Sequence, residues 1–168
     1  PPSRKDCALG VKYLAPMPLG EDHDLDTFIC RHESLANWLT RRARKNHQSG
    51  ASRVFIVSTD GGEVAGYYAL AAGSVSLKAA PGRVRRNAPD PVPVAVLGRL
   101  ATHRHHEGCG IGSGMLKDAL LRTQQLSTEI GIRAILCHAI DEQTKAFYLH
   151  HGFLASPIEP LTVMLPIK

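Results

Sequence analysis

The chain has 168 residues, of which 43% are hydrophobic and 21% are charged, and its formal net charge at pH 7 is +5. This length is enough for one well-buried core, so we expect a single domain over residues 1–168. The composition excludes a disordered chain. No apolar run approaches the roughly 20 residues of a membrane span and no apolar signal segment opens the chain, so we expect a cytoplasmic protein with no membrane partner.

The cysteines are scattered, and no two of them form a CxxC pair. This spacing argues against a disulfide framework and against a zinc ribbon, so we expect free thiols at Cys7, Cys30, Cys109 and Cys137. The positive net charge is compatible with a polyanionic partner and equally with simple solubility.

The first half of the chain predicts a strand, then helices, then a hairpin. Residues 8–15 are expected to form a short strand, and apolar residues at helical spacing over residues 26–46 indicate one or two amphipathic helices. Two strands, at 54–57 and 64–75, flank the turn residues 60–62.

The second half alternates strands and helices. Residues 78–93 are rich in proline and basic side chains, which favours an exposed loop with room for a short helical piece. A strand is expected over 94–100, and another over 132–139, where nearly every residue is apolar. The remaining expected elements are a helix with Ile111, Met115, Leu116, Ala119, Leu120 and Leu126 on its buried face, a helix capped by Asp141 and ended by Gly152, and short strands at 153–155 and 162–165. This order predicts a mixed α/β layer architecture.

A glycine-rich segment, Glu107–Gly114, lies between an expected strand and an expected helix. Glycines let the backbone approach a ligand closely, and the amides at a helix start favour an anion, so a phosphate-bearing cofactor is the natural occupant. The segment lacks the Gly-Lys-Ser/Thr of a Walker A loop, and Ser113 replaces the third glycine of a dinucleotide fingerprint. The alternative is a flexible turn without a ligand.

Histidines gather at His103-x-His105-His106 and at His150-His151. Neighbouring histidines rarely aim at one ion without a third element, and no cysteine or carboxylate lies at a recognised spacing, so we predict no metal site.

The glycine segment resembles the loop of the GNAT superfamily of N-acetyltransferases. The family pattern is Arg/Gln-x-x-Gly-x-Gly/Ala, and here it reads Glu107-x-x-Gly110-x-Gly112, with an acid at the usual basic or amide position. The likeness runs from about Val11 to Pro166. It implies a central mixed, mostly antiparallel sheet that is splayed at the cofactor site and flanked by helices.

The same resemblance implies acetyl-CoA as the cofactor. Leu100 and Ala101 would then offer backbone groups to the pantetheine arm, and Asp141 would also belong to the cofactor site. The residues expected around the pyrophosphate are Gly108, Cys109, Gly110, Ile111, Gly112 and Ser113.

Four further segments are similar to a branch of toxins within this superfamily: residues 66–70, 97–101, 139–141 and 146–153. Toxins of this branch acetylate the amino group of aminoacyl-tRNA and are encoded beside a ribbon-helix-helix antitoxin. The resemblance therefore implies aminoacyl-tRNA and such an antitoxin as partners, and a homodimer as the assembly.

Tyr148 is the candidate catalytic residue. A tyrosine hydroxyl, with an ordinary pKa of about 10, is protonated at neutral pH and can protonate a departing thiolate. Periodicity alone favours a packing role beside Phe147, and it is the family resemblance that assigns the general-acid role to Tyr148. No acid is clearly placed as a general base, and we expect a backbone N–H near Leu100 to serve the carbonyl oxygen.

Two basic groups are candidates for tRNA binding: Lys78, Arg83, Arg85 and Arg86 in the long loop, and Arg41 and Arg42 at a helix end. Two other functions stay open. One is an acetyltransferase of the same fold that acts on a protein amine or small-molecule amine. The other is a non-catalytic module that binds acyl-CoA or nucleic acid.

Overall fold

The computed structural model describes residues 10–167, which group into two compact units. The first unit comprises the chain up to Leu70 together with Arg99–Ala119, and the second comprises Ala71–Gly98 and the chain from Leu120 onward. The helices are α1 Glu33–Arg41, α2 Ala43–Ser49, α3 Gly82–Arg85, α4 Ile111–Leu126 and α5 Glu142–His150, with 3-10 turns η2 Leu77–Ala79 and η3 Arg104–His106. The strands are β1 Met17–Pro18, β2 Arg53–Ser58, β3 Val64–Val75, β4 Val92–Thr102, β5 Ala134–His138, β6 Leu154–Ala155 and β7 Thr162–Pro166.

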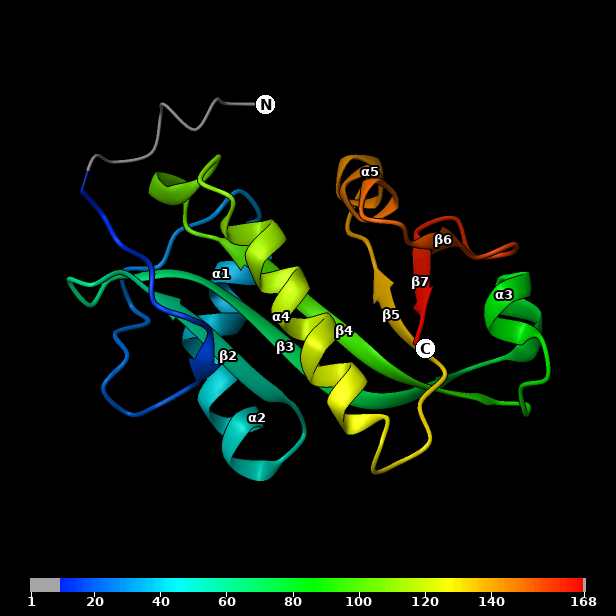
Figure 1. Ribbon diagram of the computed structural model, residues 1–168. Coiled ribbons are helices and arrows are strands. Elements are labelled where there is room, and N and C mark those ends of the chain that lie inside the picture. The colour runs from blue at the N-terminus through cyan, green and yellow to red at the C-terminus, as the bar shows by residue number, and fades with distance from the viewer. Residues whose placement is uncertain (1–9, 168) are drawn as a thin grey trace. The chain divides into compact units, whose positions relative to one another are not determined.

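The first unit is built on the antiparallel strands β1, β2 and β3. Residues Arg53–Val57 pair with Leu70–Gly66 in regular register, and a bulge follows at Ser58. Helices α1 and α2 cover these strands, and Figure 1 shows them in cyan beside β2. The expected helices over 26–46 are thus confirmed from Glu33 on, where α1 begins, and residues 26–32 are not helical.

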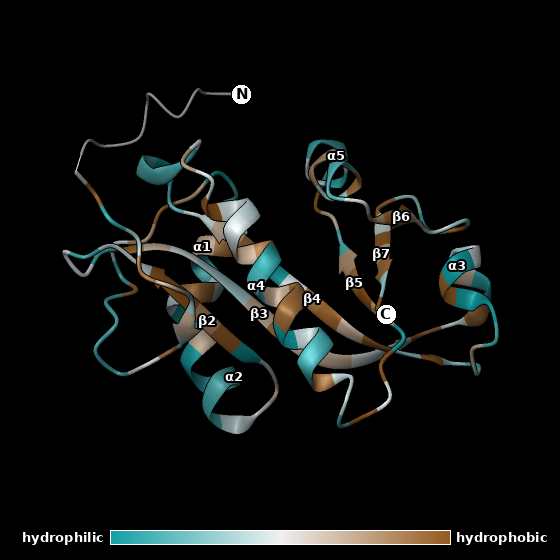
Figure 2. Cartoon of the chain, viewed as in Figure 1, coloured by the Kyte–Doolittle hydropathy of each residue, from teal (hydrophilic) through white to brown (hydrophobic). Residues whose placement is uncertain are grey.

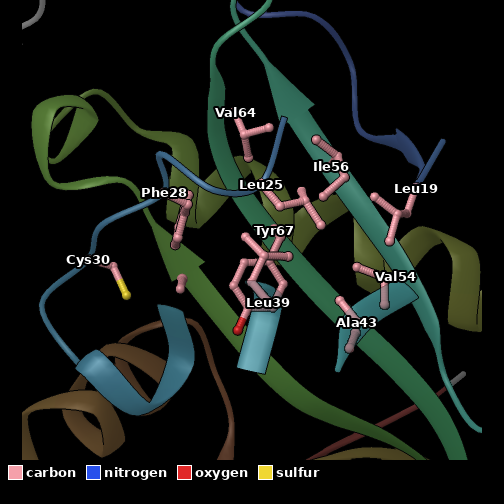
Figure 3. Close-up of a cluster of buried hydrophobic side chains, with 12 residues drawn as sticks. Leu19, Leu25, Phe28, Cys30, Leu39, Ala43, Val54, Ile56, Val64 and Tyr67 are labelled. Carbon is pink, nitrogen blue, oxygen red and sulfur yellow. The ribbon is translucent and has the colours of Figure 1, made fainter. Parts of the chain in front are cut away.

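The core of the first unit contains side chains from helices α1 and α2 and from strands β2 and β3 (Figure 3). Leu39 of α1 is fully buried with Val54 of β2 and Tyr67 of β3, and the ring of Phe28 meets the ring of Tyr67 edge to face with centroids 5.6 Å apart. Each fully buried aliphatic side chain of this kind contributes about 1.5–3 kcal/mol relative to an exposed one. The segment before α1 is therefore held by packing, although it is not helical.

The second unit contains the parallel pair β4–β5 and the antiparallel pairs β5–β7 and β7–β6. The β4–β5 register covers Val94–Val96 against Ala134–Leu136, and β5 continues to His138 with β7 as its partner. In Figure 2, β5 carries hydrophobic residues, whereas α3 is mainly hydrophilic. The predicted mixed, mostly antiparallel α/β architecture is confirmed within the units.

Three sequence-based expectations are corrected here. Residues 8 and 9 lie outside the described residues, and residues 10–15 form only an isolated bridge, from Tyr13 to Thr59, while the first strand is β1. Leu126 is 46% exposed at the end of α4 and does not join the buried face. The stretch 78–93 is not simply an exposed loop, because Val84 is fully buried.

Strands β3 and β4 and helix α4 each continue from one unit into the other. A single domain over residues 1–168 stays a prediction. No helix of the described chain is long and apolar enough to cross a bilayer.

Candidate functional site

The glycine segment of the first unit has the geometry of an anion cradle. Gly108 and Gly110 have left-handed φ values of 76° and 81°, which glycine adopts without strain. The first helical bond runs from the Gly114 N–H to the Gly110 carbonyl at 3.0 Å. The amides of residues 111–113 therefore come before that bond, at the positive end of the α4 dipole.

The space above this segment is open. A Cβ built at Gly110 or at Gly114 meets no atom within 4 Å. Open space beside the amides of a helix start, with glycines in place of side chains, is what a diphosphate needs. The residues that are present thus fit the pyrophosphate of coenzyme A.

At Glu107 an acidic side chain stands where the family pattern has a basic or amide residue. Glu107 and Arg104 are both exposed, and no ion pair joins them within residues 10–167. The Arg104 backbone N–H instead donates to the Ile29 carbonyl at 2.9 Å. A negative side chain in this loop disfavours an anion, so the backbone amides are the expected anion-binding groups.

Leu100 and Ala101 lie near the end of β4. Ala101 is 6% exposed, and its carbonyl oxygen would lie 3.1 Å from a Cβ at Gly66 of β3. Leu100 is half-buried. Their expected contacts with the pantetheine arm stay a prediction.

Tyr148 lies on α5 in the second unit and is 2% exposed. Burial raises the pKa of its hydroxyl well above the ordinary value, and its neighbour Cys137, which is hydrogen-bonded to it, acts in the same direction. The ring packs against Phe153 with centroids 5.2 Å apart. The hydroxyl therefore keeps its proton at neutral pH and has a fixed position, as a proton donor requires.

Cys137 was not identified as a site residue from the sequence. It lies on β5, is 4% exposed, and burial raises the pKa of its thiol to about 11. In the sequence it is one apolar member of an apolar strand, so no pattern links it to Tyr148. The pairing depends on how α5 packs in the second unit.

Asp141 is the N-cap of α5, as the sequence predicted. Its side chain accepts a hydrogen bond from the Thr144 backbone N–H at 2.7 Å, which stabilises the helix by about 1 kcal/mol. This bond fixes the helix that carries Tyr148. The assignment of Asp141 to the cofactor site stays a prediction.

The second unit brings four of the predicted tRNA-binding residues together around η2 and α3. Lys78, Arg83, Arg85 and Arg86 are all exposed, and the buried Val84 anchors the short helix between them. Such a group presents positive charge while its apolar residue packs inward.

Arg41 and Arg42 belong to the first unit, at the junction of α1 and α2, and both are exposed. Arg44, which belongs to the same basic run, is used structurally. Its guanidinium donates to the Gly20 carbonyl at 2.8 Å and also to the His23 carbonyl. A basic run in the sequence can thus contain both exposed and structural side chains.

The cysteines differ from the expectation of four free thiols. Cys30 and Cys137 are free and buried, but Cys109 takes part in a disulfide. Cys7 lies outside the described residues. Scattered spacing gave no signal for this bond, because a disulfide depends on proximity in the fold and not in the sequence.

The histidine motif after β4 gains a third element from the fold. Candidate ligand atoms of Glu63, His103 and His105 all lie within 4.8 Å of one another. Glu63 lies 40 residues before His103, directly before β3, which is why sequence spacing did not reveal it.

Comparisons with known proteins give the family of the chain. The model of the acetyltransferase (GNAT) domain family matches residues 50–154. A curated tRNA-acetylating toxin of Mycobacterium tuberculosis (strain ATCC 25618 / H37Rv) is 48% identical over 156 residues, which cover 93% of each chain.

Two solved structures of the toxin AtaT are also similar. AtaT complexed with acetyl-methionyl-tRNAfMet has a TM-score of 0.83 and 26% identity, with 93% of this chain and 94% of that chain covered. A mutant AtaT bound to the C-terminus of the antitoxin AtaR and acetyl-CoA has a TM-score of 0.74 and 26% identity, with 93% and 92% covered. The family model spans more than half of the sequence, and the chain therefore belongs to the GNAT family of acetyltransferases.

Proposed function

We propose that this protein transfers the acetyl group of acetyl-CoA to the α-amino group of aminoacyl-tRNA and thereby blocks translation, as the toxin of a toxin-antitoxin pair. The observation that carries the proposal is the identity of nearly half of all aligned residues with a tRNA-acetylating toxin over almost the full length of both chains. The likeness to AtaT in complex with an acetylated aminoacyl-tRNA supports the same substrate.

The glycine segment is proposed to bind the diphosphate of the cofactor. Its amides at the start of α4 supply hydrogen-bond donors, and the absence of side chains at Gly110 and Gly114 leaves room for the ligand. Bound acetyl-CoA supplies an acetyl thioester, whose sulfur leaves as coenzyme A. Leu100, Ala101 and Asp141 are proposed to orient the remainder of the cofactor.

Tyr148 is proposed to hold a proton on its Oη atom and to release it to the departing sulfur. A tyrosine hydroxyl is already protonated at neutral pH, and burial together with the Cys137 thiol fixes its position. The proton balance closes, because the amine loses one proton as its amide forms and the thiol gains one. Free α-amino groups have a pKa of about 7.7–8.0, so roughly a tenth or more of such an amine is already neutral at pH 7, and no dedicated base is required.

The exposed cations around α3 are proposed to contact the phosphates of the tRNA, with Arg41 and Arg42 as a second group. Charge reversal at Arg83, Arg85 and Arg86 tests this role. We expect weaker tRNA binding and a shallower dependence of log K on log salt, with binding of acetyl-CoA unchanged. Unchanged tRNA affinity at low salt would refute the assignment.

We further propose that the protein works in the cytoplasm, where charged tRNA is found, as a homodimer that a ribbon-helix-helix antitoxin neutralises. The antitoxin-bound AtaT structure supports a protein partner of this kind. Sequencing of the neighbouring reading frame and co-expression with its product test the pairing. The expected result is a stable complex whose formation abolishes acetyl transfer.

The substrate class is tested by incubating the purified protein with labelled acetyl-CoA and three acceptor pools: total charged tRNA, deacylated tRNA with a protein lysate, and polyamines. We expect label on charged tRNA only, and we expect alkaline hydrolysis of the ester to release it as acetyl-amino acid. Label on lysate protein or polyamine instead would favour an amine acetyltransferase with another acceptor. Absence of any transfer would favour a binding module.

A further inference from the structure

The histidine cluster of the first unit has no part in the acetyl transfer described above. It joins Glu63, at the start of β3, to the turn η3 that follows β4. We propose that Glu63, His103 and His105 form a binding site for a divalent transition-metal ion of the zinc class, which braces the turn that leads into the glycine segment.

The ligand set selects this class of ion. Two imidazoles and one carboxylate suit Zn²⁺ and leave a fourth position for water, whereas Mg²⁺ and Ca²⁺ prefer oxygen ligands alone. His103 Nε2 lies 3.5 Å from Glu63 Oε1. This separation exceeds the ~2.7–3.2 Å of an N–H···O hydrogen bond. It is close to the edge, about 3.3 Å, of a tetrahedron whose metal–ligand bonds are about 2.0–2.1 Å long.

His103 is held in place before any ion binds. It is 2% exposed, its backbone N–H donates to the Ala65 carbonyl at 2.8 Å, and its ring meets Phe28 edge to face with centroids 5.5 Å apart. Coordination through Nε2 requires the ring proton on Nδ1, which now accepts from the His105 backbone N–H at 3.1 Å. The Thr27 carbonyl also hydrogen-bonds this ring and further fixes its orientation.

Glu63 is oriented by a second layer of contacts. Its Oε2 atom lies 3.0 Å from His106 Nε2, and His106 Nδ1 in turn lies 2.8 Å from the Tyr13 hydroxyl. The Thr59 Oγ1 atom accepts from the Glu63 backbone N–H at 3.1 Å. One carboxylate oxygen is thus fixed by His106 while the other faces His103, the outer-shell arrangement found at metal sites.

An ion can reach this site from solvent. The Glu63 side chain is 43% exposed, and His105 is exposed. Since η3 ends at His106, directly before Glu107, an ion at this position would tie the start of β3 to the segment that precedes the anion cradle. The bound ion is therefore expected to stabilise the fold without taking part in the transfer of the acetyl group.

The test uses full-length protein stripped with EDTA and exchanged into metal-free buffer. Isothermal titration with ZnCl₂ should show one site per chain with a Kd below about 10 µM. Zinc at about 100-fold above Kd should raise the Tm by about 5 °C or more. Co²⁺ in place of Zn²⁺ should give the visible absorption of a tetrahedral site.

Glu63 and His105 are the residues to substitute, because both are exposed and their replacement leaves the core intact. His105→Ala and Glu63→Gln should each weaken zinc binding at least 10-fold and remove the Tm rise, while His150→Ala, outside the cluster, should change neither. Binding that survives both cluster variants, or that His150→Ala abolishes, would overturn the proposal, as would the absence of one-to-one binding. The titration and the cobalt spectrum do not depend on acetyl transfer, so the proposal stands or falls independently of the proposed function.

Discussion

Tyr148→Phe is the substitution that separates a catalytic hydroxyl from a packing ring. It keeps the ring that packs on Phe153 and removes the proton donor together with one hydrogen bond, that to the Cys137 thiol. Loss of one such bond costs about 1 kcal/mol of unfolding free energy, which lowers the Tm of a chain of this length by about 2–4 °C. Loss of a general acid lowers kcat by about 10²–10⁴-fold, equivalent to about 3–5 kcal/mol of transition-state free energy. The effect on chemistry should therefore far exceed the effect on folding.

The assay is steady-state transfer of labelled acetyl to charged tRNA at saturating acetyl-CoA, with a melting curve on the same preparations. Tyr68→Phe is the matched control, because Tyr68 is also fully buried and its hydroxyl donates to Asp118. This control should lower the Tm and leave kcat within about 3-fold of the parent. If Tyr148→Phe retained kcat within the same factor, the general-acid assignment would be wrong.

Three further predictions concern the fold around the site. Gly66→Ala should lower the free energy of unfolding by about 1–3 kcal/mol in urea titrations, because its Cβ would lie 3.1 Å from the Ala101 carbonyl oxygen, which is backbone, and 2.9 Å from the Met115 Cε atom. An unchanged urea midpoint would contradict this packing. Gly110→Ala should lower the free energy of unfolding by about 1–2 kcal/mol, because residue 110 has a left-handed φ, and it should raise the KM for acetyl-CoA. Gly98→Ala is the control for backbone strain, because the space at Gly98 is equally open and its φ is ordinary. Equal melting temperatures of the two variants would argue against strain at Gly110. Burial raises the pKa of Cys137 from 9.0 to about 11, so the native state holds this proton more tightly than the unfolded state does. The resulting stability is present below pH 9 and is lost as pH rises toward 11. The urea midpoint of Cys137→Ala should therefore fall less than that of the parent between pH 8 and 10.5. Parallel dependences of the two urea midpoints on pH would count against this linkage.

The elements that the sequence predicted best are those with a strong local signal. The strand over 64–75 and the helix that follows the glycine segment appear where the pattern placed them, since alternation and helical spacing are properties of neighbouring residues. The N-cap role of Asp141 is equally local and is confirmed. The expected strand at 8–15 is wrong for residues 10–15, because a strand needs a continuous ladder as well as a suitable sequence, and this segment forms a single bridge at Tyr13.

The sequence by itself determined the family and the glycine segment with its helix, because these depend on residue identity and short-range spacing. The choice of Tyr148 follows from the family resemblance and stays a prediction. Only the tertiary structure revealed that Cys137 adjoins Tyr148 and that Glu63 completes a cluster with His103 and His105. Those relations join residues that are 11 and 40 positions apart, and no local pattern encodes which side chains meet when strands and helices pack. The residue types that suit a site can be read along the chain, but the partners and the protonation state of each side chain are fixed by burial and by the atoms that folding brings to it.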